Sequence, residues 1–110
     1  MELAFETKNL RSICESEAYA LSQLGVVPAD TLKRRLADMM AAQTVNDLMQ
    51  LLIIPLYEDR SEASNLVVDL NCGKRMIFTH NHLRPPLLEK EKVDWSKVSR
   101  IKIIAINNHE

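Results

Sequence analysis

Glycine and cysteine are both scarce in this chain of 110 residues, which contains two of each. The phosphate-binding loops of nucleotide-binding folds need several closely spaced glycines, whereas Gly25 and Gly73 stand far apart in the sequence. We therefore expect no nucleotide cofactor. Cys14 and Cys72 do not form a Cys-x-x-Cys pair, so they are predicted to be two free thiols, as is usual in a reducing cytosol.

An excess of charge of one sign and long apolar runs are missing as well. The formal net charge is -1, so no global field attracts nucleic acid, and any RNA or DNA site has to be a local patch. No apolar run reaches the roughly 18 residues that a membrane helix needs. The start of the chain, residues 1–6, carries acids and lacks the features of a secretory signal. These absences predict a cytoplasmic protein that does not bind membranes.

The composition that remains is that of a globular protein. Apolar residues make up 46% of the chain and charged residues 26%, and this length is sufficient for a hydrophobic core without disulfides or metal ions. We therefore predict one domain that spans residues 1–110.

The first part of the chain has the pattern of a strand followed by two helices. Apolar and polar side chains alternate over residues 2–6, as in a strand with one wet face. Apolar residues then recur at steps of three and four from Lys8 to Leu24, and Gly25 suits the end of that helix. Pro28 suits the first turn of a second helix, which would make a helical hairpin. Its predicted buried stripe consists of Leu32, Leu36, Met39 and Met40.

The second part of the chain has the pattern of strands. Residues 51–57 are apolar and contain a proline, which favours an edge strand. Residues 66–70 and 74–80 alternate and flank a turn in which Gly73 provides a positive φ. The β-branched run 101–106 is expected inside the sheet. The whole order predicts an α+β fold in which the helices pack on one face of a mostly antiparallel sheet.

Several local predictions follow from the same patterns. Thr44 and Asp47 resemble a capping box that opens a short helix. Asp94 is expected to cap a turn, and Trp95 to cover an edge of the core rather than to bind a base. The residues predicted to be buried in one core are Phe5, Leu10, Ile13, Leu21, Leu32, Leu36, Val68, Met76, Phe78 and Ile103.

The polar residues contain no recognisable metal site. His80 and His82 place two imidazoles close together, but no cysteine or carboxylate set stands nearby to complete four ligands. We therefore predict no metal and no metal-dependent chemistry. The basic residues Lys74, Arg75, Arg84, Lys102 and the histidine His109 either are ordinary solvated charges or converge on one exposed face, and their spacing alone leaves both interpretations open.

Four segments of the chain, taken in order, resemble the HigB-like killer proteins of the RelE/ParE toxin superfamily. They are Met1-Glu-Leu-Ala-Phe-Glu6, Leu36-Ala-Asp-Met-Met-Ala-Ala42, the span from Val68-Asp-Leu70 to Gly73-Lys-Arg-Met-Ile-Phe78, and the span from Val93-Asp-Trp-Ser-Lys-Val98 to Ile101-Lys-Ile103. The resemblance covers nearly the whole length. It implies a RelE-like fold, in which an N-terminal strand and a helical hairpin pack on a sheet whose first strand pairs with its last.

The resemblance also implies a function and a set of site residues. Many members of this family are ribosome-dependent mRNA endonucleases of type II toxin-antitoxin systems, need no cofactor, and are held inactive by a helix-turn-helix antitoxin encoded beside them. Arg75 matches the family's arginine on this strand and is expected to clamp the scissile phosphate. The family's C-terminal Asp-Tyr-His aligns with residues 107–109, so His109 is expected to act as acid or base. Lys74, Lys102 and Arg84 are expected to bind RNA.

The chain departs from this family at Asn107 and Asn108. These residues replace an acid that orients and an aromatic that stacks on a base. A second interpretation is therefore a RelE-fold protein that acts by binding alone, either as a ParE-like inhibitor of a topoisomerase or as an inactive partner in a complex with an antitoxin or repressor. The sequence leaves these interpretations open.

Overall fold

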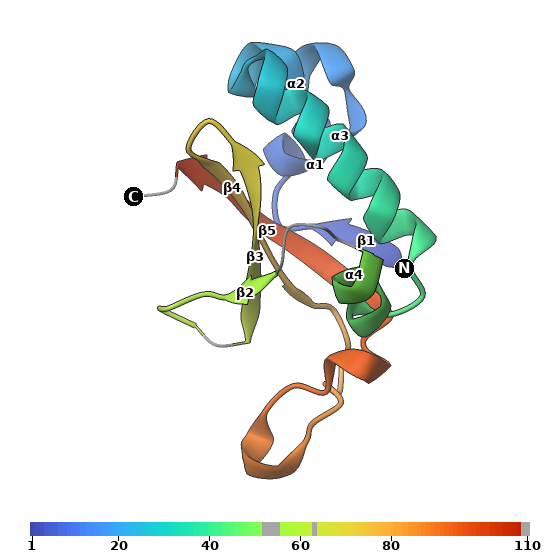
Figure 1. The fold of residues 1–110 in the computed structure, drawn as a ribbon. Coiled ribbons are helices and arrows are strands. Elements are labelled where there is room, and N and C mark those ends of the chain that lie inside the picture. The colour runs from blue at the N-terminus through green and yellow to red at the C-terminus, as the bar shows by residue number, and fades with distance from the viewer. Residues whose placement is uncertain (52–55, 63, 109–110) are drawn as a thin grey trace.

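The computed structural model describes residues 1–51, 56–62 and 64–108. These residues form four α-helices and one five-stranded sheet (Figure 1). In chain order the elements are β1 (Glu2–Phe5), α1 (Lys8–Glu15), α2 (Glu17–Leu24), α3 (Val26–Ala41), α4 (Val45–Leu51), β2 (Tyr57–Glu58), β3 (Asn65–Asn71), β4 (Lys74–His80) and β5 (Arg100–Asn108), with short 3-10 turns at Glu89–Glu91 and Trp95–Lys97 between the last two strands.

The strands lie in the order β1-β5-β4-β3-β2. The N-terminal strand pairs in parallel with β5, for example Leu3 with Ile101, whereas the other three pairings are antiparallel. The predicted α+β class and mostly antiparallel sheet are thus confirmed, and so is the pairing of the first strand with the last. The expected strand over residues 51–57 is wrong at Leu51, which ends α4, and its positions 52–55 are outside the described residues. Its last residue, Tyr57, begins the edge strand β2.

The core lies between the helices and one face of the sheet. Figure 1 shows α1, α2 and α3 together on one side of the strands. Phe78 is fully buried there, together with Val45 and Leu48 of α4. The sheet residues of this cluster are Leu66, Val68, Leu70, Met76, Phe78, Ile101 and Ile103. They alternate along each strand as expected for one buried face. No helix of the described residues has the length and apolar character needed to span a membrane.

The helical hairpin forms, but the expected continuous helix from Lys8 to Leu24 is wrong. The backbone is extended at Ser16, and the Ser16 hydroxyl accepts a hydrogen bond from the Tyr19 N–H at 3.2 Å. A serine in this conformation is a strong helix N-cap, so a second helix starts there. Because a new helix begins at this point, a different set of its side chains faces the core. Ala20 of α2 is buried, whereas Leu21 is 49% exposed.

The core prediction is confirmed for seven of its residues and fails for Leu21. Phe5 and Leu36 are only partly buried and pack against the core. In α3, Met39 is buried but Met40 is 68% exposed, contrary to the predicted stripe. Consecutive helix residues point about 100° apart, so only one of these two methionines can face the sheet. The seven confirmed residues are Leu10, Ile13, Leu32, Val68, Met76, Phe78 and Ile103.

Local capping and turn chemistry agree with the sequence. The Thr44 hydroxyl accepts a hydrogen bond from the Asp47 N–H at 3.2 Å at the start of α4. The β3–β4 turn has positive φ at Cys72 and Gly73, as two-residue hairpin turns of the type I′ family require. Asn71 also has positive φ, next to a one-residue register shift between Asp69 and Asn71. The Asn71 side-chain amide donates to the Thr31 hydroxyl at 2.8 Å, which ties this turn to α3.

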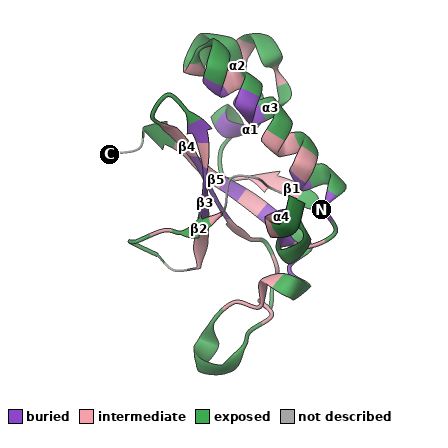
Figure 2. Ribbon diagram, viewed as in Figure 1, coloured by how far each residue is buried: buried purple, intermediate pink, exposed green. Residues whose placement is uncertain are grey.

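Residues 81–99 form an arm that extends away from the sheet (Figure 1, orange) and is exposed over much of its length (Figure 2). The base of the arm is held by His82, whose Nε2 accepts hydrogen bonds from the backbone N–H groups of Ser99 and Arg100 at 3.1 and 3.3 Å. Asp94 caps the 3-10 turn at Trp95, and Trp95 packs against the core. The predicted packing of Trp95 against an edge of the core is thereby confirmed.

Truncation of Phe78 to Ala is expected to lower the free energy of unfolding by about 3–5 kcal/mol, because it removes a fully buried aromatic ring and leaves a cavity. Urea denaturation of the purified protein measures this loss. The matched control is Leu83→Ala, since Leu83 is fully exposed on the arm, and its effect is expected to stay within about 0.5 kcal/mol. A loss at Phe78 no larger than at Leu83 would contradict the position of the core.

Candidate functional site

The candidate site lies on the face of the sheet that points away from the helices. Side chains that face one another across a strand pair lie on the same side of a sheet. The register pairs Asp69 with Arg75 and Arg75 with Asn107, and it pairs Tyr57 with Val67. Because Val67 and Asp69 share a face, Tyr57, Asp69, Arg75 and Asn107 gather on the side that points away from helices α1–α4. We call these four residues the Arg75 cluster.

Two hydrogen bonds join the members of the Arg75 cluster in pairs. The Arg75 Nε–H donates to Asn107 Oδ1 at 2.9 Å, and the Tyr57 hydroxyl is 3.3 Å from Asp69 Oδ1. Next to the cluster, the Lys74 ammonium donates to Asn108 Oδ1 at 2.6 Å. Two adjacent cations on β4 are thus positioned by two adjacent amides on β5.

The protonation of the cluster follows from its surroundings. Burial and the nearby Asp69 carboxylate raise the pKa of Tyr57 above its usual value, and the Arg75 guanidinium opposes this shift in part. The tyrosine therefore holds its proton at physiological pH. Arginine stays charged throughout that range, and none of the ion pairs among the described residues involves Arg75. The cluster thus presents a cation, a carboxylate and a neutral hydroxyl side by side.

The residues predicted to form the site are only partly brought together. Lys74 and Arg75 start β4 at the same end of the sheet as Asn107 and Asn108. Lys102 lies opposite Thr79, about 13 Å further along the strand by the usual strand rise, and forms an ion pair with Glu6 at 3.0 Å. Arg84 is exposed on the arm, away from the strands. His109 lies outside the described residues.

The two neighbouring histidines do not form a shared site. His82 accepts backbone hydrogen bonds at the base of the arm. The pKa of His80 is lowered by burial, and also by the nearby His82 and Lys102. Its Nδ1 is buried without a hydrogen-bond partner among the described residues. Over residues 1–51, 56–62 and 64–108, no three side chains of the metal-ligating types come together.

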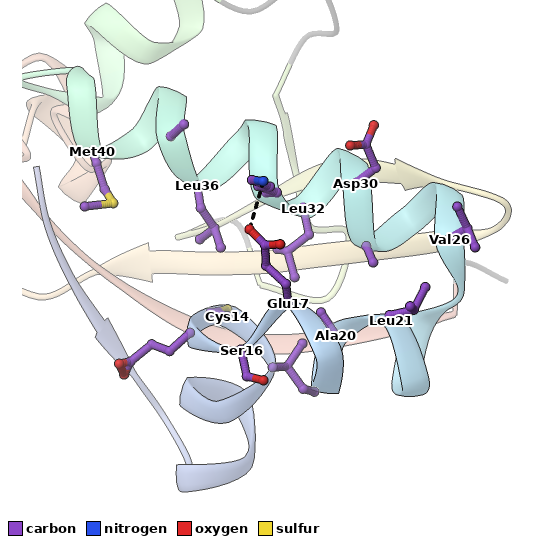
Figure 3. A pocket seen from close by; sticks show the side chains of 15 residues that line it. Cys14, Ser16, Glu17, Ala20, Leu21, Val26, Asp30, Leu32, Leu36 and Met40 are labelled. Atoms are coloured by element: carbon purple, nitrogen blue, oxygen red, sulfur yellow. Dashed lines mark ion pairs between the residues drawn. The ribbon is translucent and has the colours of Figure 1, made fainter.

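A concave region lies on the helical side of the molecule. It is a groove of about 450 Å³ between α1, α2 and α3 (Figure 3). Its walls are mainly apolar, and the Glu17 carboxylate forms an ion pair with Lys33 at 2.8 Å across it. Burial, with a contribution from Glu15, raises the pKa of the Cys14 thiol in its wall to about 12. A thiol with such a pKa is a poor nucleophile at neutral pH, so the groove offers a surface rather than catalytic groups.

Two members of the Arg75 cluster were not singled out from the sequence. Asp69 stands at a polar position of its strand, but the turn at Gly73 alone would place Leu70 opposite Arg75. Asp69 pairs with Arg75 because the register shifts by one residue between Asp69 and Asn71, which the sequence pattern does not predict. Tyr57 carries no sequence signal. Its place beside Asp69 depends on β2 lying next to β3, which local periodicity does not predict.

Comparison with known proteins adds no family assignment. A scan against models of protein families finds no match, and a search of curated proteins finds none that is significantly similar. The geometry of the Arg75 cluster is therefore the basis on which a function is proposed below.

The two cysteines are expected to differ sharply in reactivity. With a pKa of about 12, roughly 10⁻⁴ of the Cys14 thiol is ionised at pH 8, whereas Cys72 is exposed in the hairpin turn. Alkylation of the folded protein with iodoacetamide, followed by mass spectrometry, should label Cys72 first. In a Cys72→Ser variant the fast labelling should disappear. Equal labelling rates for both thiols in the folded protein would contradict the burial of Cys14.

Proposed function

We propose that this protein is the toxin of a type II toxin-antitoxin system, a HigB-like member of the RelE/ParE superfamily that cleaves mRNA on the ribosome. The observation that carries the proposal is the Arg75 cluster, in which a guanidinium without an ion-pair partner among the described residues lies beside a carboxylate and a neutral hydroxyl on the sheet face that points away from the helices. The strand order also supports a RelE-like fold, since β1 precedes a helical hairpin and pairs with β5.

The chemistry of RNA cleavage explains why these groups are needed. In metal-independent cleavage the 2′-hydroxyl attacks the adjacent phosphorus, and the bond to the 5′-oxygen breaks. The reaction needs a proton acceptor, a proton donor, and a cation that stabilises the extra negative charge on the phosphorane. The guanidinium of Arg75 matches the geometry of a phosphate and supplies that cation.

The electrostatic pattern is also compatible with an RNA substrate. The net charge of the chain is -1, so attraction to the phosphate backbone has to come from a local patch. Arg75 supplies a local cation on the face that points away from the helices, and Lys74 adds a second positive charge at the same end of the sheet, with its side chain on the opposite face. The proposed partners are the ribosome with its mRNA, in the cytoplasm, and a helix-turn-helix antitoxin.

A second function is favoured by the two asparagines at the end of β5. Asn107 and Asn108 accept hydrogen bonds from Arg75 and Lys74, and an amide does not transfer protons at neutral pH. A RelE-fold protein that has exchanged its C-terminal acid and aromatic for two amides can keep its fold and its binding surface without catalysis. This alternative is a ParE-like topoisomerase inhibitor or an inactive partner of an antitoxin.

Induced expression of the wild-type chain is expected to arrest growth, with mRNA cut at translated codons. Arg75→Ala should relieve the arrest without unfolding the protein, because loss of one positioned charge-stabilising group lowers such rates by roughly 10²–10³-fold. Growth curves and mapping of mRNA ends measure both effects. The matched control is Arg34→Ala, since Arg34 is exposed on α3 and pairs with Asp30, and this variant should remain toxic.

The same experiment separates the alternatives. His109→Gln is expected to act in the same direction as Arg75→Ala if this histidine transfers a proton. Arrest that survives both substitutions, with intact messages and broken DNA, would instead indicate topoisomerase inhibition. A wild type without toxicity that binds the neighbouring helix-turn-helix protein tightly would indicate an inactive partner.

A further inference from the structure

The proposed RNA cleavage needs proton-transfer groups that the end of β5 does not supply. Asn107 and Asn108 occupy the positions before His109, and neither amide is an acid or a base near neutral pH. The face of the sheet that points away from the helices offers two groups of the required kind. They are the Tyr57 hydroxyl and the Asp69 carboxylate, which are 3.3 Å apart.

The backbone holds these two groups next to the phosphate-binding cation. Asp69 is the cross-strand partner of Arg75 in the β3–β4 hairpin. Tyr57 lies on the edge strand β2 and pairs with Val67 of β3. Val67 is two residues before Asp69, so Tyr57 and Asp69 are diagonal neighbours on one face of the sheet. Its side chain remains accessible, because Tyr57 is 37% exposed. A phosphodiester bound by Arg75 would therefore lie within reach of both groups.

We propose that Tyr57 is the general acid that protonates the 5′-leaving oxygen, and that Asp69 accepts the proton of the attacking 2′-hydroxyl. This assignment rests on the proposed cleavage of RNA and gives catalytic roles to two residues that the family resemblance does not assign. Arg75 keeps its role as the cation that stabilises the phosphorane.

The residues of the Arg75 cluster supply and accept every proton that this step transfers. The 2′-oxygen forms a bond to phosphorus while its proton moves to the Asp69 carboxylate. The bond from phosphorus to the 5′-oxygen breaks, and that oxygen takes the Tyr57 proton. The products are a 2′,3′-cyclic phosphate and a 5′-hydroxyl. Transfer of the proton from Asp69 to the Tyr57 phenolate, along the hydrogen bond that joins them, restores both groups.

The protonation state of Tyr57 agrees with the role of an acid. Burial and the Asp69 carboxylate raise its pKa, and Arg75 only partly offsets this. The hydroxyl is therefore fully protonated under physiological conditions, while it remains far more acidic than the alcohol it protonates. A proton donor of this kind typically accelerates a reaction by 10²–10⁴-fold.

The decisive experiment compares two substrates that differ in one atom. Ribosome-bound mRNA fragments carry either the normal 5′-oxygen or a bridging 5′-sulfur at the scissile phosphodiester. A thiolate leaves without protonation, so the sulfur substrate does not need a general acid. Tyr57→Phe is expected to slow cleavage of the oxygen substrate by roughly 10²–10⁴-fold and to cleave the sulfur substrate at a rate close to that of the wild type. Such rescue also demonstrates that the variant is folded.

Three further variants complete the test. Asp69→Asn and Arg75→Ala should slow both substrates, because proton removal from the 2′-hydroxyl and charge stabilisation are needed in each case. The matched control is Tyr19→Phe, which removes a hydroxyl that donates to Asn9 on the helical layer at 2.6 Å. This control should cleave both substrates like the wild type.

The outcomes distinguish this inference from the proposed function. A Tyr57→Phe variant that cleaves the oxygen substrate at the wild-type rate, or that is slowed equally on both substrates, overturns the role of Tyr57 while RNA cleavage stands. A wild type that cleaves neither substrate on the ribosome overturns the proposed function, and this assignment with it.

Discussion

The register of the β3–β4 hairpin is the constraint on which the rest of the structure depends. Side chains alternate between the two faces of a strand, so a shift of one residue would exchange the faces. The turn at Cys72 and Gly73, together with a one-residue register shift between Asp69 and Asn71, sets the register in which Phe78 points to the helices. The same register points Arg75 to the opposite face. The core and the candidate site are therefore two consequences of one pairing.

The candidate site also depends on an apolar support beneath it. Val67 and Ile77 lie opposite each other on the face that carries the Arg75 cluster and are buried, although the described helices pack on the other side. Tyr57 pairs with Val67 at the sheet edge. These buried apolar side chains are closely packed beneath the polar cluster. Tyr57, the proposed proton donor, also covers part of this apolar surface.

The two faces of the molecule have different chemical characters. On the helical side the groove is apolar, and the acids in its walls are engaged in ion pairs, as Glu17 is with Lys33. On the side that faces away from the helices, Arg75 is held by the neutral amide of Asn107, and the Asp69 carboxylate lies on the opposite strand without forming an ion pair with it among the described residues. Lys74 is the preceding residue of β4, so its side chain points to the other face, where it donates to Asn108. A chain with a net charge of -1 thus places one guanidinium where the candidate chemistry lies.

The sequence by itself determined the local elements of this protein, including the strands around the turn, the cap at Thr44 and the class of fold. These features follow from backbone periodicity and from hydrogen bonds between residues close in the chain. Only the tertiary structure decided that Ser16 divides a helix, that Lys102 lies far from Arg75, and that Tyr57 reaches Asp69. The neighbour of a strand or the phase of a helix is chosen by burial across the whole core, and that choice joins residues that no local pattern connects.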